Sequence, residues 1–226
     1  MNISIASYAF HGLVAAKSMD VFGYLEACRF RYGLGTADIW NGMLASYEPD
    51  YLKLVHEALI ERELTLQNLC VDQAHIWDDN PEIRERNSQN AEGALRAAVQ
   101  LDARTLRIDA GGQGTSWTNE QLDTIVARYR SWAQFAADHG FRVGPENHWG
   151  PEAVPANMVS LCKAVDHPAL GVLLHHKDLA ADAAFAPWAM HTHMSWEWCT
   201  GGHLEEGMAM LQTAGYRGCW GIEHHS

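Results

Sequence analysis

The 226-residue sequence lacks the features of several classes of protein. No apolar run approaches the roughly 18 residues that a membrane-spanning helix needs. The first residues, MNISIASYAF, lack the basic segment and the long apolar run of a secretory signal peptide. The five cysteines are odd in number and widely spaced, with no C-x-x-C pair. These absences predict a cytoplasmic protein with free thiols and no membrane partner.

Basic residues are scarce as well, because 16 Lys and Arg stand against 28 Asp and Glu, for a formal net charge of −12. Binding to nucleic acid draws on Lys and Arg to neutralise phosphates, so no nucleic acid partner is expected. Histidine, by contrast, occurs 13 times. Histidine is the commonest metal ligand, and many of these residues gather in the last quarter: His175, His176, His191, His193, His203, His224 and His225.

Short apolar segments alternate with longer segments of helical periodicity, and no linker or low-complexity stretch separates them. We therefore expect one domain over residues 1–226. Between Thr118, a predicted N-cap, and Gly140 the pattern predicts a helix. Strands are predicted at Ile3–Ser7, Thr36–Trp40, Thr65–Cys70, Thr105–Asp109, Arg142–Glu146, Gly171–His175, Met190–Met194 and Cys219–Glu223.

Eight strands that alternate with helices imply parallel pairing, in either an open doubly wound sheet or a closed barrel. Polar residues at the strand ends favour an α/β fold of the (β/α)8 TIM barrel type. The sequence stops three residues after Glu223, so the eighth helix is predicted to be missing. The outer face near the eighth and first strands would then be bare. We expect a second subunit of a homodimer to cover it, or else the helix around Val21–Phe30, shifted across the gap.

Four predicted strand ends carry side chains that can bind a metal: Glu146, His175, His193 and Glu223. Each of them alone has an ordinary structural explanation, such as a helix cap, an ion pair or a hydrogen-bonded core histidine. Together they fall at the ends of consecutive strands five to eight, which meet at one mouth of a barrel. Two carboxylates and two imidazoles suit Mn, Fe, Co or Zn better than Mg. The pattern predicts one divalent metal site.

Further residues beyond the strand ends are predicted to shape a pocket. His148 lies two residues past Glu146 on the same side of an extended chain, so it is either an additional base or a loop histidine bonded to the backbone. Aromatic rings stack on the apolar faces of sugars, and Trp40 is one of several tryptophans near strand ends. The residues predicted to bind substrate are His75, Lys177, His203, Trp117 and Trp149.

Three other positions are given structural interpretations. Trp132 lies in the middle of a predicted helix and is expected in the core. Asp38 and Arg107 lie on strands and are expected to form a buried ion pair. His224 and His225 are assigned no role.

Several motifs resemble those of the xylose isomerase-like superfamily, which includes sugar and sugar-phosphate isomerases and epimerases and the relatives of endonuclease IV. GPENHWG is similar to the fifth-strand Glu-Asn-His element of that family, and MHTHMSW to its seventh-strand His-x-His. LEEGMAMLQTAGYRGCWGIE resembles the run to the final ligand glutamate, and ALRAAVQLDARTLRID the helix and strand before the site. The resemblance implies a TIM barrel with one divalent metal, of which Mn is favoured and Co, Fe or Zn are alternatives.

One departure concerns the sixth strand, which in the family ends in Asp-x-x-His with the Asp on the metal. Here the stretch reads His175-His176-Lys177-Asp178, so the two residue types are exchanged and His175 stands at the ligand position. The site would carry one negative charge less than is usual in the family.

The resemblance implies an isomerase or epimerase of a sugar or keto-sugar. Glu146 and Glu223 would act as the acid and base, in proton abstraction next to a metal-bound carbonyl through an enediolate. The alternative is a metal-dependent lyase or deglycosidase acting on a 3-keto-sugar conjugate, with His148 as a base. A DNA repair enzyme of the endonuclease IV kind is disfavoured by the acidic charge and by Asp109, which falls where the fourth-strand His is expected. The fourth hypothesis is that the protein is a non-enzymatic relative that has lost its metal.

Overall fold

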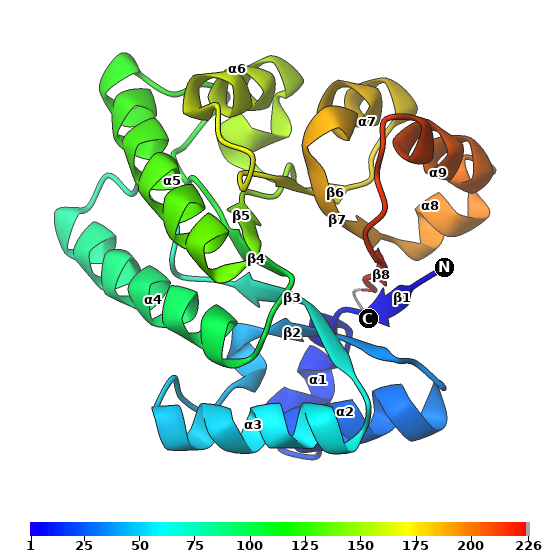
Figure 1. Ribbon diagram of the computed structural model, residues 1–226. Helices are drawn as coiled ribbons and strands as arrows, with labels where there is room; N and C mark the ends of the chain where they lie inside the picture. Colours follow the sequence, from blue (N-terminus) through cyan, green and yellow to red (C-terminus); the bar gives the residue numbers. More distant parts are fainter. Residues whose placement is uncertain (225–226) are drawn as a thin grey trace.

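The computed structural model describes residues 1–224, in which eight strands alternate with helices along the chain (Figure 1). Every predicted strand is present, with ends that differ by at most two residues. His225, to which no role was assigned, lies outside the described residues. The strands are β1 (Ile3–Ile5), β2 (Thr36–Trp40), β3 (Thr65–Val71), β4 (Thr105–Ile108), β5 (Arg142–Gly144), β6 (Val172–His175), β7 (Ala189–Met194) and β8 (Trp220–Ile222).

All strand pairs are parallel, and they form two four-stranded sheets with the orders β1-β8-β7-β6 and β2-β3-β4-β5. Isolated parallel bridges connect the sheets at both seams, Ala6 with Asp38 on one side and Val143 with Leu170 on the other. The strands occupy the centre, and the helices lie outside them (Figure 1). This arrangement is the predicted TIM-barrel fold and excludes the open doubly wound sheet.

The helices follow the strands as the periodicity predicts. Thr118 and Gln121 form a capping box at the start of α5, and Gly140 ends that helix with a left-handed φ of 80°. The helices are α1 (His11–Ala15), α2 (Val21–Glu26), α3 (Pro49–Glu61), α4 (Pro81–Gln100), α5 (Asn119–His139), α6 (Pro155–Val165), α7 (Leu179–Phe185), α8 (Trp196–Thr200) and α9 (Leu204–Thr213). Within residues 1–224, no helix has the length and apolar character to cross a membrane.

The main apolar core joins side chains of the helices to the strands they cover. Trp132 of α5 belongs to this core at 4% exposure, as predicted. The buried residues of the strands also include many polar ones, among them Asp38, Asn68, Arg107 and His193. Because buried polar groups require partners, these side chains form one connected network, and that network holds the candidate site.

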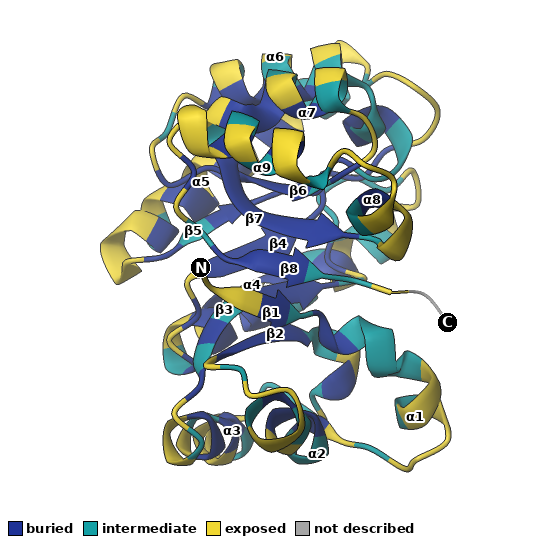
Figure 2. Ribbon diagram, turned by 90° about the vertical axis from the view of Figure 1, so that its right-hand side faces the viewer, coloured by how far each residue is buried: buried dark blue, intermediate teal, exposed yellow. Residues whose placement is uncertain are grey.

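The outer face at β8 and β1 is partly bare (Figure 2). No helix follows β8 within the described residues, and Ile3 is 36% exposed. Trp220 on β8 is nevertheless only 4% exposed and packs edge-on against Tyr216. The alternative of a shifted helix is wrong, because α2 is tied to β1 and β2. Its Tyr24 hydroxyl donates to the Ile5 carbonyl (2.7 Å) and accepts from the Asp38 amide (2.8 Å). A second subunit over this face stays a prediction.

Candidate metal centre

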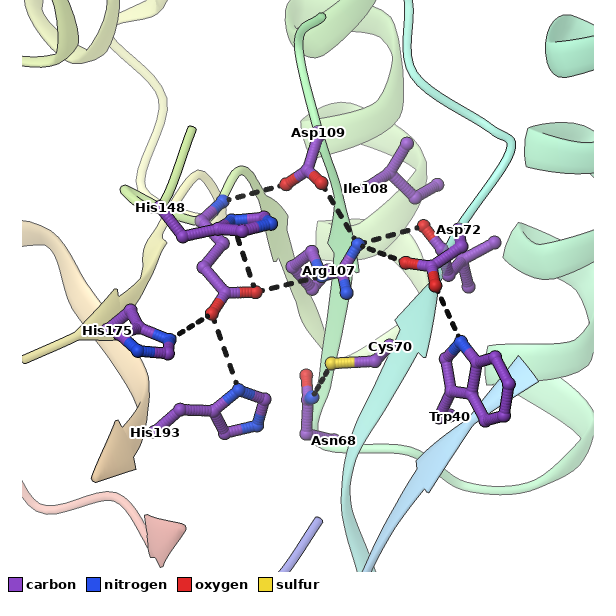
Figure 3. A network of polar contacts seen from close by, with 12 residues as sticks. Trp40, Asn68, Cys70, Asp72, Arg107, Ile108, Asp109, His148, His175 and His193 are labelled. Carbon is purple, nitrogen blue, oxygen red and sulfur yellow. Dashed lines mark hydrogen bonds and ion pairs between the residues drawn. The ribbon is translucent and has the colours of Figure 1, made fainter. Parts of the chain in front are cut away.

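The four predicted ligand side chains converge at the carboxyl ends of β5 to β8. Each of them offers one ligand atom, and these atoms all lie within 4.8 Å of one another. Glu146 Oε1 is 3.0 Å from His175 Nδ1 and 3.4 Å from His193 Nδ1. Glu223 Oε2 lies 3.5 Å from His175 Nδ1 and 3.6 Å from His193 Nδ1. Two carboxylates and two imidazoles therefore face one point. Figure 3 shows the two imidazoles, those of His175 and His193, directed toward the same carboxylate.

A buried nitrogen atom of His193 also indicates that these four side chains fit a divalent metal. His193 Nδ1 is buried and makes no hydrogen bond to the described residues, although two carboxylate oxygens lie near it. A buried polar atom without a partner is costly, by about 1–3 kcal/mol, and such atoms are rare. A cation bound between the imidazoles and the carboxylates would satisfy this nitrogen. Nitrogen and oxygen donors together suit Mn, Fe, Co or Zn.

Glu146 is the most enclosed of the four, with a side chain 3% exposed. Burial alone would raise the pKa of its carboxyl, but His148, His175 and His193 together lower that pKa well below its usual range. Arg107 Nε adds a further positive group 3.2 Å from Glu146 Oε2. The carboxylate is therefore held in its ionised form, which is the form that binds a cation.

Asn147, in the Glu-Asn-His element, was not predicted as a site residue. Its side-chain Nδ2 donates to the His175 carbonyl (3.1 Å), and its Oδ1 accepts from the His175 amide (2.6 Å). The amide side chain thus imitates a peptide group and continues the pairing of β5 with β6 beyond the strand ends. Asn147 thereby fixes the backbone of His175 relative to that of its own neighbour, Glu146. An asparagine between two candidate ligand strands was the sequence signal for this role.

Asp109, the residue after β4, has a comparable role. One carboxylate oxygen accepts from the Glu146 amide (3.1 Å), and the other from Arg107 Nη1 (3.0 Å) and Trp149 Nε1 (3.3 Å). Glu152 lies beside it, fully buried, and accepts from the Ala110 amide at 2.7 Å. Burial and the neighbouring Asp109 carboxylate raise the pKa of Glu152 well above its usual range. The pKa values of two buried glutamates six residues apart are thus shifted in opposite directions.

A cavity of about 250 Å³ opens onto the four side chains. His148 also lines this cavity, and its Nδ1 lies 3.6 Å from Glu146 Oε2. Trp40 forms part of the wall, as predicted for the aromatic rim, and its indole NH donates to Asp72 Oδ2 at 2.7 Å. Several lining residues were not predicted there: Ala6, Tyr8, Asp38, Cys70, Asp72 and Arg107.

The five residues predicted to bind substrate lie outside the lining of this cavity. His75 pairs with Asp78 (3.2 Å), and the Lys177 ammonium donates to the His148 carbonyl (2.8 Å). His203 is exposed at the start of α9, where its ring lies 5.8 Å from that of Trp198. The Trp117 indole donates to the Gly111 carbonyl (2.8 Å). Trp149 packs edge-on against His75. In this structure these side chains support the loops around the cavity.

The predicted ion pair between Asp38 and Arg107 is wrong. The Arg107 guanidinium contacts Asp72, Asp109 and Glu146 instead, at 3.0, 3.0 and 3.2 Å. Asp38 contacts two histidines of β7, His191 at 2.7 Å and His193 at 3.2 Å. Burial alone would raise the pKa of Asp38, but His191 and His193 hold it well below its usual range. Residue type predicted a buried charge at each position, but it could not identify the partner among the several charged groups inside the barrel.

Comparison with known proteins agrees with this fold. Among solved structures, a D-psicose 3-epimerase from Clostridium cellulolyticum, solved with D-tagatose, is 18% identical, with a TM-score of 0.76 over 99% of this chain and 84% of that one. A probable 3-DHS dehydratase involved in petrobactin synthesis, from Bacillus anthracis, is 14% identical, with a TM-score of 0.74 over 100% and 93%. A 3-keto-D-glucoside 4-epimerase from E. coli is 15% identical, with a TM-score of 0.72 over 90% and 86%.

Sequence comparison alone is less informative at the level of single proteins, since no curated protein matches the chain. A family model described as "Xylose isomerase-like TIM barrel" does match, over residues 30–176. That range covers β2 to β6 and includes two of the four converging side chains, Glu146 and His175. The chain belongs to the xylose isomerase-like TIM barrel family.

Proposed function

We propose that the protein is a divalent-metal-dependent isomerase or epimerase of a sugar or keto-sugar. The observation that carries this proposal is the convergence of Glu146, His175, His193 and Glu223 on one point of a cavity. Mn²⁺ is the favoured ion, with Co²⁺, Fe²⁺ and Zn²⁺ as alternatives. When bound, the ion would polarise a substrate carbonyl and stabilise the negative charge that develops as a neighbouring C–H loses its proton.

The chain supplies the groups that move the proton. Glu146 and Glu223 approach the same point from β5 and β8, so each can exchange a proton with a substrate held between them. One carboxylate removes a proton from a carbon next to the carbonyl, and the other carboxyl group returns a proton to give the epimer or isomer. Arg107 contacts Glu146 through Oε2, whereas His175 and His193 contact Oε1, so the carboxylate is held from both sides.

The charge of the cavity favours an uncharged substrate. Among the described residues that line the cavity, one is a lysine or arginine, namely Arg107. Its guanidinium already contacts three carboxylates. A phosphate group would therefore find no uncompensated cation on the lining. Tyr8 and Trp40 provide an aromatic wall, with their rings edge-on at 5.0 Å, which suits the apolar face of a sugar ring. The same charge balance disfavours a DNA backbone as substrate.

The test combines metal analysis with an exchange assay. We expect the purified protein to bind about one equivalent of Mn²⁺ or Co²⁺ by calorimetry. With ketohexoses and 3-keto-glucosides in D₂O, it should incorporate deuterium next to the carbonyl, and a chelator should abolish that exchange. A folded protein that binds none of the four metals, or that exchanges no proton in any of these substrates, would contradict the proposal.

A second candidate function is elimination from a 3-keto-sugar conjugate, and the position of His148 favours it. The imidazole lies in the cavity beside Glu146, and its side chain is 31% exposed. A base at this place could remove the proton next to the ketone. The electron pair would form the carbon–carbon double bond while the bond to the β-substituent breaks, and a carboxyl group would protonate the departing oxygen.

His148→Ala separates the two functions. Under the leading proposal the two glutamates move the protons, so the variant should retain most of its epimerising activity and its metal affinity. Under the elimination mechanism, release of the substituent should fall by about 10²–10⁴-fold, the usual contribution of a general base. Rates on both substrate classes, measured by NMR, decide between them. His75→Ala, which removes a histidine outside the cavity lining, is the matched control.

A further inference from the structure

We propose that Asp38 is the positioning residue of the metal centre: its carboxylate fixes the ring of His193 and its tautomer, so that Nδ1 is the ligand atom. This inference rests on the proposed metal site and extends it to residues on the opposite side of the barrel. Asp38 stands on β2, whereas His193 stands on β7, and the sequence separation is 155 residues.

The contacts of Asp38 determine which ring nitrogen of His191 and of His193 carries the proton. Its Oδ2 lies 2.7 Å from His191 Nε2 and 3.2 Å from His193 Nε2, and its Oδ1 accepts from Asn68 Nδ2 at 3.0 Å. An ionised carboxylate can only accept hydrogen bonds. Both Nε2 atoms must therefore carry the hydrogen, and a neutral His193 then has its free lone pair on Nδ1.

The surroundings of His193 Nδ1, on the other side of the ring, fit the tautomer with hydrogen on Nε2. Nδ1 is buried, makes no hydrogen bond to the described residues, and faces Glu146 Oε1 at 3.4 Å and Glu223 Oε2 at 3.6 Å. In the Nε2–H tautomer, Nδ1 faces these two carboxylate oxygens with a lone pair and no hydrogen of its own to donate. A cation bound there would satisfy this nitrogen, so the tautomer that Asp38 imposes is the one that completes a metal site.

Packing holds the ring in the same orientation. Asp38, His191 and His193 are each at most 1% exposed, and the two histidine rings lie edge-on with centroids 5.6 Å apart. Gly221 of β8 closes the other side. A Cβ on Gly221 would lie 2.2 Å from the Thr192 carbonyl oxygen, 2.9 Å from His191 Nε2 and 3.2 Å from His193 Cδ2, so there is no room for a side chain beside these rings. The rings are thus confined between Asp38 and the β8 backbone.

The first experiment measures metal affinity without any substrate. Asp38→Asn keeps the shape of the side chain but removes the charge that holds Nε2–H. We expect it to weaken Mn²⁺ and Co²⁺ binding by about 10–100-fold, the usual effect of removing such a partner. His191→Gln is the matched control, because its amide nitrogen is as many bonds from Cα as the imidazole Nε2. It disturbs the same buried network but leaves the contact from Asp38 to His193, so its affinity should stay within about tenfold of the native value.

The second experiment uses the native protein and does not depend on a variant that folds. Nitrogen-15 NMR of the Zn²⁺-loaded protein should show His193 protonated on Nε2 and bound to metal through Nδ1. Metal on Nε2, or an Asp38→Asn variant that folds and binds metal as tightly as the native protein, would overturn the positioning role. A native protein that binds no metal would instead refute the proposed metal site. In that case, NMR of the metal-free protein still tests whether Asp38 holds Nε2–H.

Discussion

Glu146→Gln is expected to reduce turnover of the sugar substrate by about 10²–10⁴-fold, because the amide cannot accept a proton from carbon. Metal affinity should fall by a smaller factor. The amide oxygen can still face the centre, and His175, His193 and Glu223 remain. The two quantities are measured separately, turnover by deuterium exchange in saturating Mn²⁺ and affinity by calorimetry. Equal losses in both would show that Glu146 serves only to hold the metal.

The chain offers a matched control for this substitution in Glu152, six residues further on. Glu152 is fully buried like Glu146 but lies outside the cavity lining. The raised pKa of its carboxyl favours the neutral acid, which an amide imitates in shape and charge. Glu152→Gln should therefore leave both turnover and stability near the native values. Loss of activity in both variants would mean that any change in this loop disturbs the site.

Much of the fold could be predicted because local patterns and tertiary packing agree. The strand at Thr36–Trp40 was located to the residue, and the helix between Thr118 and Gly140 had both its cap and its terminating glycine in the sequence. Strand ends were predicted less well, as at Arg142–Glu146, where the observed strand ends at Gly144. Beyond that residue the backbone pairs with β6 through an isolated bridge, Glu146 with Leu173, and the Asn147 side chain then continues the pairing. Periodicity cannot detect such a change.

The candidate site was predicted less completely, for a geometric reason. Glu146, His175, His193 and Glu223 stand at strand ends, so a barrel was enough to predict that they converge. Asp38 and Arg107 lie within strands, and their partners depend on which strands face each other across the barrel. The order of the strands along the sequence does not give the distances between side chains that face each other across the barrel. The predicted substrate-binding residues were placed by proximity to strand ends, and in the structure His75 packs against Trp149 outside the lining of the cavity. A contact with substrate stays a prediction for them.

His175→Asp is expected to change the metal preference, because it restores the carboxylate that the family has at this position. The substitution should be well tolerated in geometry. His175 faces the centre with Nδ1, and an aspartate Oδ atom is as many bonds from Cα as Nδ1 is. Imidazole favours Zn²⁺ and Co²⁺, whereas carboxylate favours Mn²⁺ and Mg²⁺. The ratio of the Mn²⁺ to the Zn²⁺ dissociation constant should fall by at least about tenfold, or about 1.4 kcal/mol.

His175→Asn separates the charge from the reach of the side chain. It brings an oxygen to the same place without the negative charge, so affinity for both metals should drop below that of the native protein. In His175→Asp the added charge should compensate for the lost imidazole and raise Mn²⁺ affinity above the native value. Calorimetric titration of the three proteins with both ions measures these differences. If aspartate and asparagine weaken both metals equally, the carboxylate does not reach the ion. If neither substitution changes affinity, His175 is not a ligand, and the site has three protein ligands.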